Sequence, residues 1–268
     1  MKTMPKLFIL LLIVFMGINL LPAQESGLSG LASQVSSQIN QDNIGFNNPN
    51  LITKLAVLVG IALLPYVIML LTSFIKMIVV LSLLRNALGV QQTPPNQVLT
   101  GIALLLTIYV MFPTGLAMYN AGKDAMANNP PQQMFSGESA VYIINVVDKA
   151  KEPMRQFIEK NSSGKIQTSF YQIAKTMFPE PYKSSLNRSD FIVLIPTFIL
   201  SQLKAAFEIG VLIYLPFFVI DLVTSNILLA MGMMMLSPLT IALPIKLLLL
   251  VMIDGWTVLV QGLVLTFR

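Results

Sequence analysis

Four long apolar stretches constrain the fold of this chain more than any other feature. They are residues 51–84, 98–122, 191–224 and 239–267. Of all residues, 55% are hydrophobic and only 11% are charged, whereas soluble domains carry about 25% charged residues. Stretches of this length can cross a lipid bilayer only if their backbone groups bond internally, as they do in helices. The sequence therefore predicts an all-α integral membrane protein.

Every apolar stretch contains proline. The positions are Pro65, Pro113, Pro196, Pro216 and Pro244. A proline inside a helix removes one backbone donor and kinks the helix, and the freed carbonyl must find a partner within the protein. We therefore expect kinked helices and helical hairpins that pack mainly on protein. As one helix, residues 51–84 would be about 50 Å long against a hydrocarbon core of about 30 Å, so this stretch must tilt, project from the bilayer or break at Pro65.

The missing residue types exclude most chemistry. The chain has no Cys and no His, which removes thiolate catalysis, most zinc sites and the usual general base. It also has no G-x-x-x-x-G-K-[ST], G-x-S-x-G or H-E-x-x-H motif. We expect no enzymatic activity, no metal and no cofactor. The basic residues lie mostly in the first residues and in one polar segment, which argues against a nucleic-acid partner.

The first 50 residues have the pattern of a secretory leader. Lys2 and Lys6 precede an apolar run, and Pro22-Ala23 is a plausible cleavage point, which predicts a signal peptide over residues 1–23. An uncleaved first transmembrane helix is the alternative. Residues 24–50 are rich in Ser, Asn and Gln and are expected to form a flexible extracytoplasmic segment.

Residues 123–190 form the one sizeable polar segment. Helical spacing of apolar residues predicts an amphipathic helix through Ile166, Phe170, Ile173, Ala174 and Met177. Val141, Ile144 and Val147 suggest another helix. We expect a small helical extracytoplasmic domain between a first apolar helical pair, residues 51–122, and a second, residues 191–268. This topology places nine basic residues outside, against the positive-inside tendency, which weakens for long translocated segments.

Apart from Lys54 at the start of the first stretch, six charges lie within the apolar stretches. They are Lys76, Lys204 and Lys246, and Glu208, Asp221 and Asp254. Their sum is neutral, as mutual pairing would require, and an unpaired intramembrane charge costs at least about 2.5 kcal/mol. Lys204 precedes Glu208 by one turn, the weaker order for an intrahelical pair, which favours partners on another segment or subunit. The alternatives are snorkelling to an interface, or a proton path through Glu208 and Asp221 in a proton-coupled secondary transporter.

The string MGMMMLSP, residues 231–238, interrupts the second apolar pair. Gly232 and Pro238 bracket the methionines and favour a turn over a continuous helix. Methionine is unbranched, flexible and polarizable, so a cluster of such side chains can adapt to varied surfaces. It can equally fill an irregular core, and spacing alone leaves both interpretations open.

Several strings resemble one family. They are TSFIKMIVVLSLLRNALG (72–89), PPNQVLTGIAL (94–104), EPMRQFI (152–158), LKAAFEIG (203–210), LPFFVIDLV (215–223), MGMMMLSP (231–238), IALPIKL (241–247) and VMIDGW (251–256). In collinear order they resemble the FliP family, the flagellar biosynthetic members of the type III secretion export gate. Lys76 departs from the pattern, because an arginine is expected there. The leader and the polar segment look more like the flagellar branch than the virulence branch.

The resemblance implies a pore-forming core subunit of the flagellar export gate. In that family about five copies associate helically with FliQ and FliR, close to FlhB, and unfolded flagellar substrates pass through the channel. The expected location is the bacterial inner membrane, multi-pass, within the flagellar basal body. The resemblance also implies that Met233, Met234 and Met235 form a gasket that closes the channel, with Gly232 and Pro238 bounding the loop.

Overall fold

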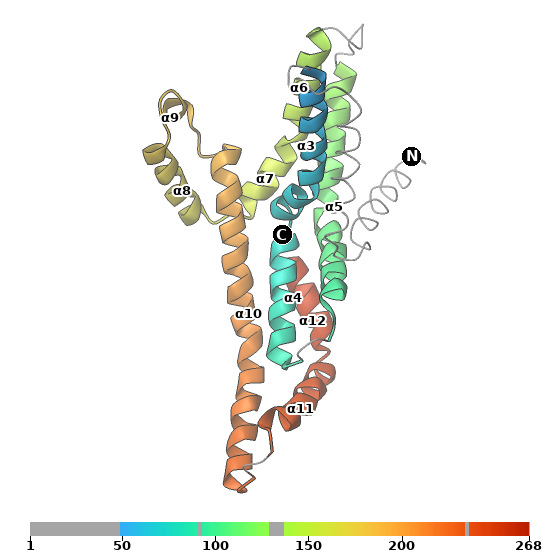
Figure 1. The fold of residues 1–268 in the computed structure, drawn as a ribbon, viewed down its shortest axis with the longest axis vertical. Helices are drawn as coiled ribbons and strands as arrows, with labels where there is room; N and C mark the ends of the chain where they lie inside the picture. The colour runs from blue at the N-terminus through green and yellow to red at the C-terminus, as the bar shows by residue number, and fades with distance from the viewer. Residues whose placement is uncertain (1–48, 91–92, 129–136, 234–235, 268) are drawn as a thin grey trace, which may run out of the picture. The chain divides into compact units, whose positions relative to one another are not determined.

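A computed structural model describes residues 49–90, 93–128, 137–233 and 236–267 of the chain, and within these ranges all regular structure is helical. The predicted all-α fold is confirmed. The helices are α3 (Pro49–Leu71), α4 (Phe74–Leu88), α5 (Asn96–Asn128), α6 (Gly137–Ala150), α7 (Glu152–Lys160), α8 (Gly164–Met177), α9 (Tyr182–Ser185), α10 (Phe191–Ala230), α11 (Pro238–Met252) and α12 (Gly255–Leu265) (Figure 1). The chain divides into two units, Met1–Leu63 and Leu64–Arg268, and the packing below is that of the second. The predicted signal peptide and nearly all of the segment 24–50 lie outside the described residues.

Two helices and two bent helix pairs are long and apolar enough to cross a membrane. The helices are residues Asn96–Met126 of α5 and the whole of α10. The pairs are Pro65–Leu71 with α4, bent by 78°, and α11 with α12, bent by 64°. If each pair counts as one span, the described chain has four, which matches the four apolar stretches of the sequence.

The first bend does not lie at Pro65, so of the three alternatives for this stretch the structure does not have the break at that proline. Helix α3 continues through that proline and ends at Leu71, and α4 begins three residues later. Between them lie Thr72 and Ser73, both buried. Hydroxyl side chains compete with the helical backbone for hydrogen bonds, and the Thr72 hydroxyl donates to the Met69 carbonyl at 3.5 Å. Polar residues in an apolar run end this helix, whereas the proline only interrupts the series of backbone hydrogen bonds within it.

The second bend lies at Asp254, again not at the proline of its stretch, since Pro244 sits inside α11. Asp254 adopts a left-handed conformation with φ of 48°, and its carboxylate accepts a hydrogen bond from the Thr257 hydroxyl at 2.9 Å. Aspartate tolerates this conformation better than most residues. The following Gly255 has no room for a side chain, because a Cβ there would lie 2.6 Å from Leu250 Cδ1 and 3.1 Å from the Leu250 carbonyl oxygen.

Replacing Gly255 by alanine should therefore destabilise the protein by about 1–2 kcal/mol, as overpacking does. The matched control is Gly262→Ala in the same helix, where an added Cβ meets nothing within 4 Å. That change should instead stabilise α12 by up to about 1 kcal/mol through helix propensity. Thermal unfolding of the two variants in detergent measures both effects. Equal midpoints would show that the bend does not depend on close approach.

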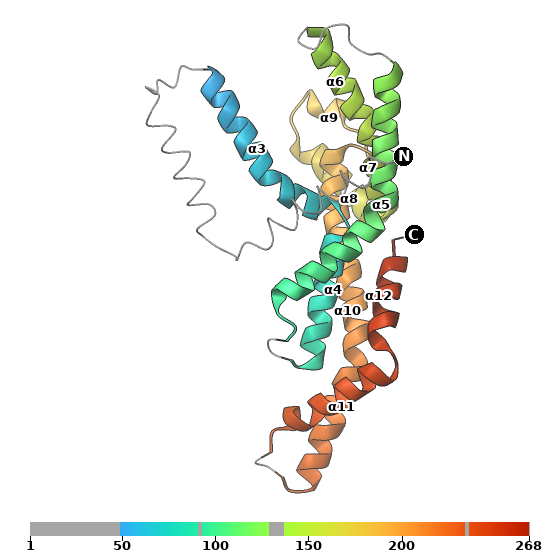
Figure 2. The ribbon, with the colours of Figure 1, turned by 90° about the vertical axis from the view of Figure 1, so that its right-hand side faces the viewer.

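The core of the second unit forms where α4 meets α10, α5 and α12. Its buried residues are Met77, Val80, Leu81, Leu99, Ala103, Ala206 and Leu263. Both views show α10 running alongside α4 (Figures 1 and 2). The two helices approach closely at Gly210, where a Cβ would lie 2.2 Å from Leu83 Cδ1. Burial of apolar side chains along this contact stabilises the pairing of the two helices.

The polar segment forms helices α6 to α9, of which α6 and α8 correspond to the two that helical spacing predicted. Helix α8 coincides with the predicted amphipathic helix, and Ala174 is its buried residue. The turn between α7 and α8 docks on α10: the Ser163 amide donates to Ser201 Oγ at 3.0 Å, and Gln202 Nε2 donates to the Asn161 carbonyl at 2.7 Å. The first three turns of α10 therefore lie against the helices of the polar segment. A 40-residue helix is about 60 Å long, so α10 has the length to reach from this segment through a bilayer.

Candidate functional site

The structure brings Lys246 and Asp221 together. Lys246 Nζ lies 2.7 Å from Asp221 Oδ2 and also donates to the Ala87 carbonyl at 3.0 Å. The lysine is 2% exposed and the aspartate side chain 35%. The ammonium thus links α11 to α10 and to the last turn of α4, whose free carbonyls favour a cation. Gly89 ends α4 in a left-handed conformation with φ of 77°.

Lys76 has a different environment. Its ammonium lies 3.8 Å from the centroid of the Phe267 ring and donates to the Thr266 hydroxyl at 3.4 Å. The residue is 4% exposed, and no carboxylate of the described ranges lies within salt-bridge distance of it. A ring face attracts a desolvated cation by about 2 kcal/mol, so the end of α12 supplies the stabilisation here. Sequence reasoning missed this contact, because nothing local links residue 76 to residue 267.

The other three of the six charges, Lys204, Glu208 and Asp254, are exposed in this chain. Lys204 Nζ lies 3.6 Å from Glu208 Oε1 on α10, and both side chains are about two-thirds exposed. Within the part of the chain that is described, Lys204 therefore pairs with its own helix and not with another segment, because one helical turn brings the two side chains within reach. An exposed pair of this kind contributes little stability. Asp254 has no cation within salt-bridge distance among the residues described. A partner subunit for these three charges stays a prediction.

The methionine block begins where α10 stops. Gly232 is left-handed with φ of 69°; its amide donates to the Leu229 carbonyl, and the Met233 amide donates to the Leu228 carbonyl, both at 3.1 Å. These two bonds are the helix-ending pattern that favours glycine at this position. Pro238 is the first residue of α11, where its missing N–H costs nothing. Met231 is 66% exposed and Met233 is 41% exposed, while Met234 and Met235 lie outside the described residues.

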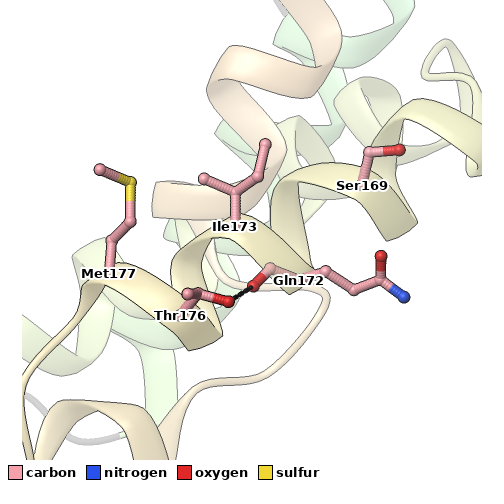
Figure 3. A pocket seen from close by; sticks show the side chains of 5 residues that line it. All are labelled: Ser169, Gln172, Ile173, Thr176 and Met177. Carbon is pink, nitrogen blue, oxygen red and sulfur yellow. Dashed lines mark hydrogen bonds between the residues drawn. The ribbon is translucent and has the colours of Figure 1, made fainter.

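A shallow groove on α8 carries no chemistry that would make it a site. It is lined by Ser169, Gln172, Ile173, Thr176 and Met177. All five side chains come from one helix, and the Thr176 hydroxyl donates to the Gln172 carbonyl at 3.0 Å (Figure 3). None of the five is charged. In the described ranges, no group of three or more carboxylate side chains lies close enough to hold a metal ion.

Comparison with known proteins gives consistent relatives. The model of the FliP family matches residues 57–263. The hypersensitivity response secretion protein HrcR of Ralstonia nicotianae is 44% identical over 211 residues, which are 78% of this chain and 94% of that protein. The Yop proteins translocation protein R of Yersinia pestis is 45% identical over 222 residues, 82% of this chain and 97% of that protein. The virulence protein YscR of Salmonella typhimurium is 44% identical over 213 residues, which are 80% of this chain and 95% of that protein.

Proposed function

Because this chain belongs to the FliP family of type III secretion export gates, we propose that it is a pore-forming core subunit of such a gate. Family membership makes it a membrane component of the export apparatus and not an enzyme. The pore-forming role is the further step. Its single strongest support is the methionine block, where α10 ends and α11 begins on either side of exposed Met231 and Met233.

The proposed constriction is a ring of methionine side chains from several copies. Each copy would contribute Met233, Met234 and Met235, bounded by the helix stop at Gly232 and the helix start at Pro238. Flexible thioether side chains can close on themselves against water and ions, and can rearrange around an unfolded polypeptide of any sequence. Such a ring needs no chemistry of its own, which agrees with a chain that lacks His and Cys.

The proposed partners are further copies of this chain, FliQ, FliR and FlhB, assembled in the bacterial inner membrane. Exposed apolar side chains around the Lys204–Glu208 pair support such an assembly, among them Leu200, Phe207 and Val211. The competing transporter function receives no support from the ion pairs. It requires a proton path through Glu208 and Asp221, and Asp221 is engaged by Lys246.

The flagellar branch is the finer part of the proposal. The relatives named above carry names from virulence secretion, and the alignments leave about a fifth of this chain unmatched while covering nearly all of theirs. The predicted leader falls within residues 1–48, which precede the family match at residue 57. We expect the chain to restore swimming to a flagellated strain that lacks its own FliP-family subunit. Restored effector secretion in an injectisome mutant, without motility, would assign it to the virulence branch.

The proposed pore is tested by asking whether the methionine ring closes it to small ions. Replacing Met233, Met234 and Met235 together by alanine should leave the complex assembled with its co-expressed neighbours but permeable to small ions. Conductance of purified complexes in planar bilayers measures the leak, and the mass of the detergent-extracted complex measures assembly. Met252→Ala serves as control, because Met252 is exposed at the far end of α11. Unchanged conductance in an intact triple variant would remove the methionine ring from the proposal.

A further inference from the structure

Helix α11 contacts the rest of the chain through one stripe of side chains. Ala242, Lys246 and Leu250 lie four residues apart and are 1%, 2% and 5% exposed. Side chains on its other faces, such as Leu248 and Val251, are mostly exposed. The stripe therefore sets where α11 lies on its neighbours, and Lys246 is its only polar member.

The Lys246 ammonium fixes the position of α11 on the neighbouring helices. An apolar stripe can shift along another helix at modest cost, because dispersion and burial are not directional. A buried ammonium cannot shift, because it must keep acceptors for its protons. Here the acceptors are the Asp221 carboxylate on α10 and the Ala87 carbonyl at the end of α4. Two acceptors on two different helices specify both the rotation and the height of α11. Buried polar groups are best documented in this role of fixing register.

Neither helix that adjoins α11 in the chain continues its axis. The chain passes through a left-handed residue at Gly232 before it and at Asp254 after it, and the axis turns by 64° between α11 and α12. Gly232 is exposed, and a Cβ there would meet nothing within 4 Å. The orientation of α11 therefore depends on its own contacts.

We infer that Lys246 is a positioning residue for the pore constriction: its bonds to Asp221 and Ala87 hold α11, and so hold the end of the methionine loop at Pro238, in the closed arrangement. This rests on the proposed function, in which that loop closes the channel. Lys246 contacts neither the loop nor a substrate in this role. It acts through the helix that begins where the loop ends.

The test uses the whole co-expressed complex with Lys246→Met, which keeps the length of the side chain and removes its charge. We expect a complex of native mass whose closed-state conductance is at least about tenfold higher, the factor that corresponds to a shift of 1.4 kcal/mol between closed and open states. Asp221→Asn should give a smaller rise, because the Ala87 carbonyl remains as an acceptor. Lys183→Met is the matched control: the same substitution, on an exposed lysine of α9, should leave conductance at the wild-type level.

Three outcomes decide the inference. Wild-type conductance in an intact Lys246→Met complex overturns it. Loss of native mass in both Lys246→Met and Asp221→Asn also overturns it, because the pair would then serve folding and not the position of the loop. A leak in the methionine triple variant without a leak in Lys246→Met removes the inference and leaves the proposed function standing. No leak in the triple variant removes the proposed function itself.

Discussion

Replacing Lys246 by glutamate should abolish assembly of the export complex. The new carboxylate would stand beside Asp221 and the Ala87 carbonyl, in a position that is 2% exposed. Removing one partner of a fully buried ion pair costs about 3–5 kcal/mol. The 35% exposure of the Asp221 side chain lowers this cost for an uncharged replacement such as methionine, whereas a second carboxylate beside Asp221 raises it. Such a cost is comparable to the whole stability of many domains. The mass of the extracted complex, with the chain's own expression level, measures the effect.

Two companion variants separate the ion pair from a general sensitivity to charge. The exchange Lys246→Glu with Asp221→Lys keeps opposite charges together and should restore part of the assembled fraction. Lys204→Glu places the same change on an exposed face and should leave the fold of the single chain intact. If Lys246→Glu assembled as well as the wild type, the pair would not be buried as described.

The second large effect is expected at Gly210, where α10 and α4 approach closely. A leucine there should destabilise the chain by about 3 kcal/mol, the upper end of what overpacking usually costs. Its Cβ alone would lie 2.2 Å from Leu83 Cδ1 and 3.3 Å from Leu83 Cβ, so both helices must move apart. The thermal midpoint in detergent should fall, and resistance to protease should fall with it.

Gly101→Leu is the control for this substitution. Gly101 lies within α5, and an added Cβ there meets nothing within 4 Å, so the midpoint should stay close to that of the wild type. A Gly210→Leu variant with an unchanged midpoint would mean that α4 and α10 do not depend on their close contact. The core around Met77 and Ala206 would then be secondary to other contacts.

The helices themselves could be predicted from the sequence, because apolar stretches of this length have few alternatives in a membrane. Gly232 was predicted to favour a turn over a continuous helix, and α10 ends there, since glycine adopts a left-handed conformation without steric cost. The prolines predicted kinks in the helices, but the two sharp bends lie at other residues. Proline gives a strong local signal, whereas Thr72 and Asp254 are single polar residues in apolar runs, and their effect depends on the packing around them.

The pairing of charges was only partly accessible to sequence reasoning. The neutral sum of six charges predicted pairing, but no local pattern says that Lys246 meets Asp221, 25 residues away, or that Lys76 meets an aromatic ring near the end of the chain. Contacts of this kind depend on which helices lie side by side. The methionine loop was found by composition, but its proposed role comes from family resemblance, because the same residues could equally fill a core.

Helix α10 has a mechanical consequence. Its first turns are bonded to the turn between α7 and α8, and its last turn leads into the methionine loop, with no break over the residues between (Figure 2). A continuous helix transmits a push or a tilt along its whole length. A displacement of the polar helices would therefore also displace the start of the loop, limited by the contact of α10 with α4.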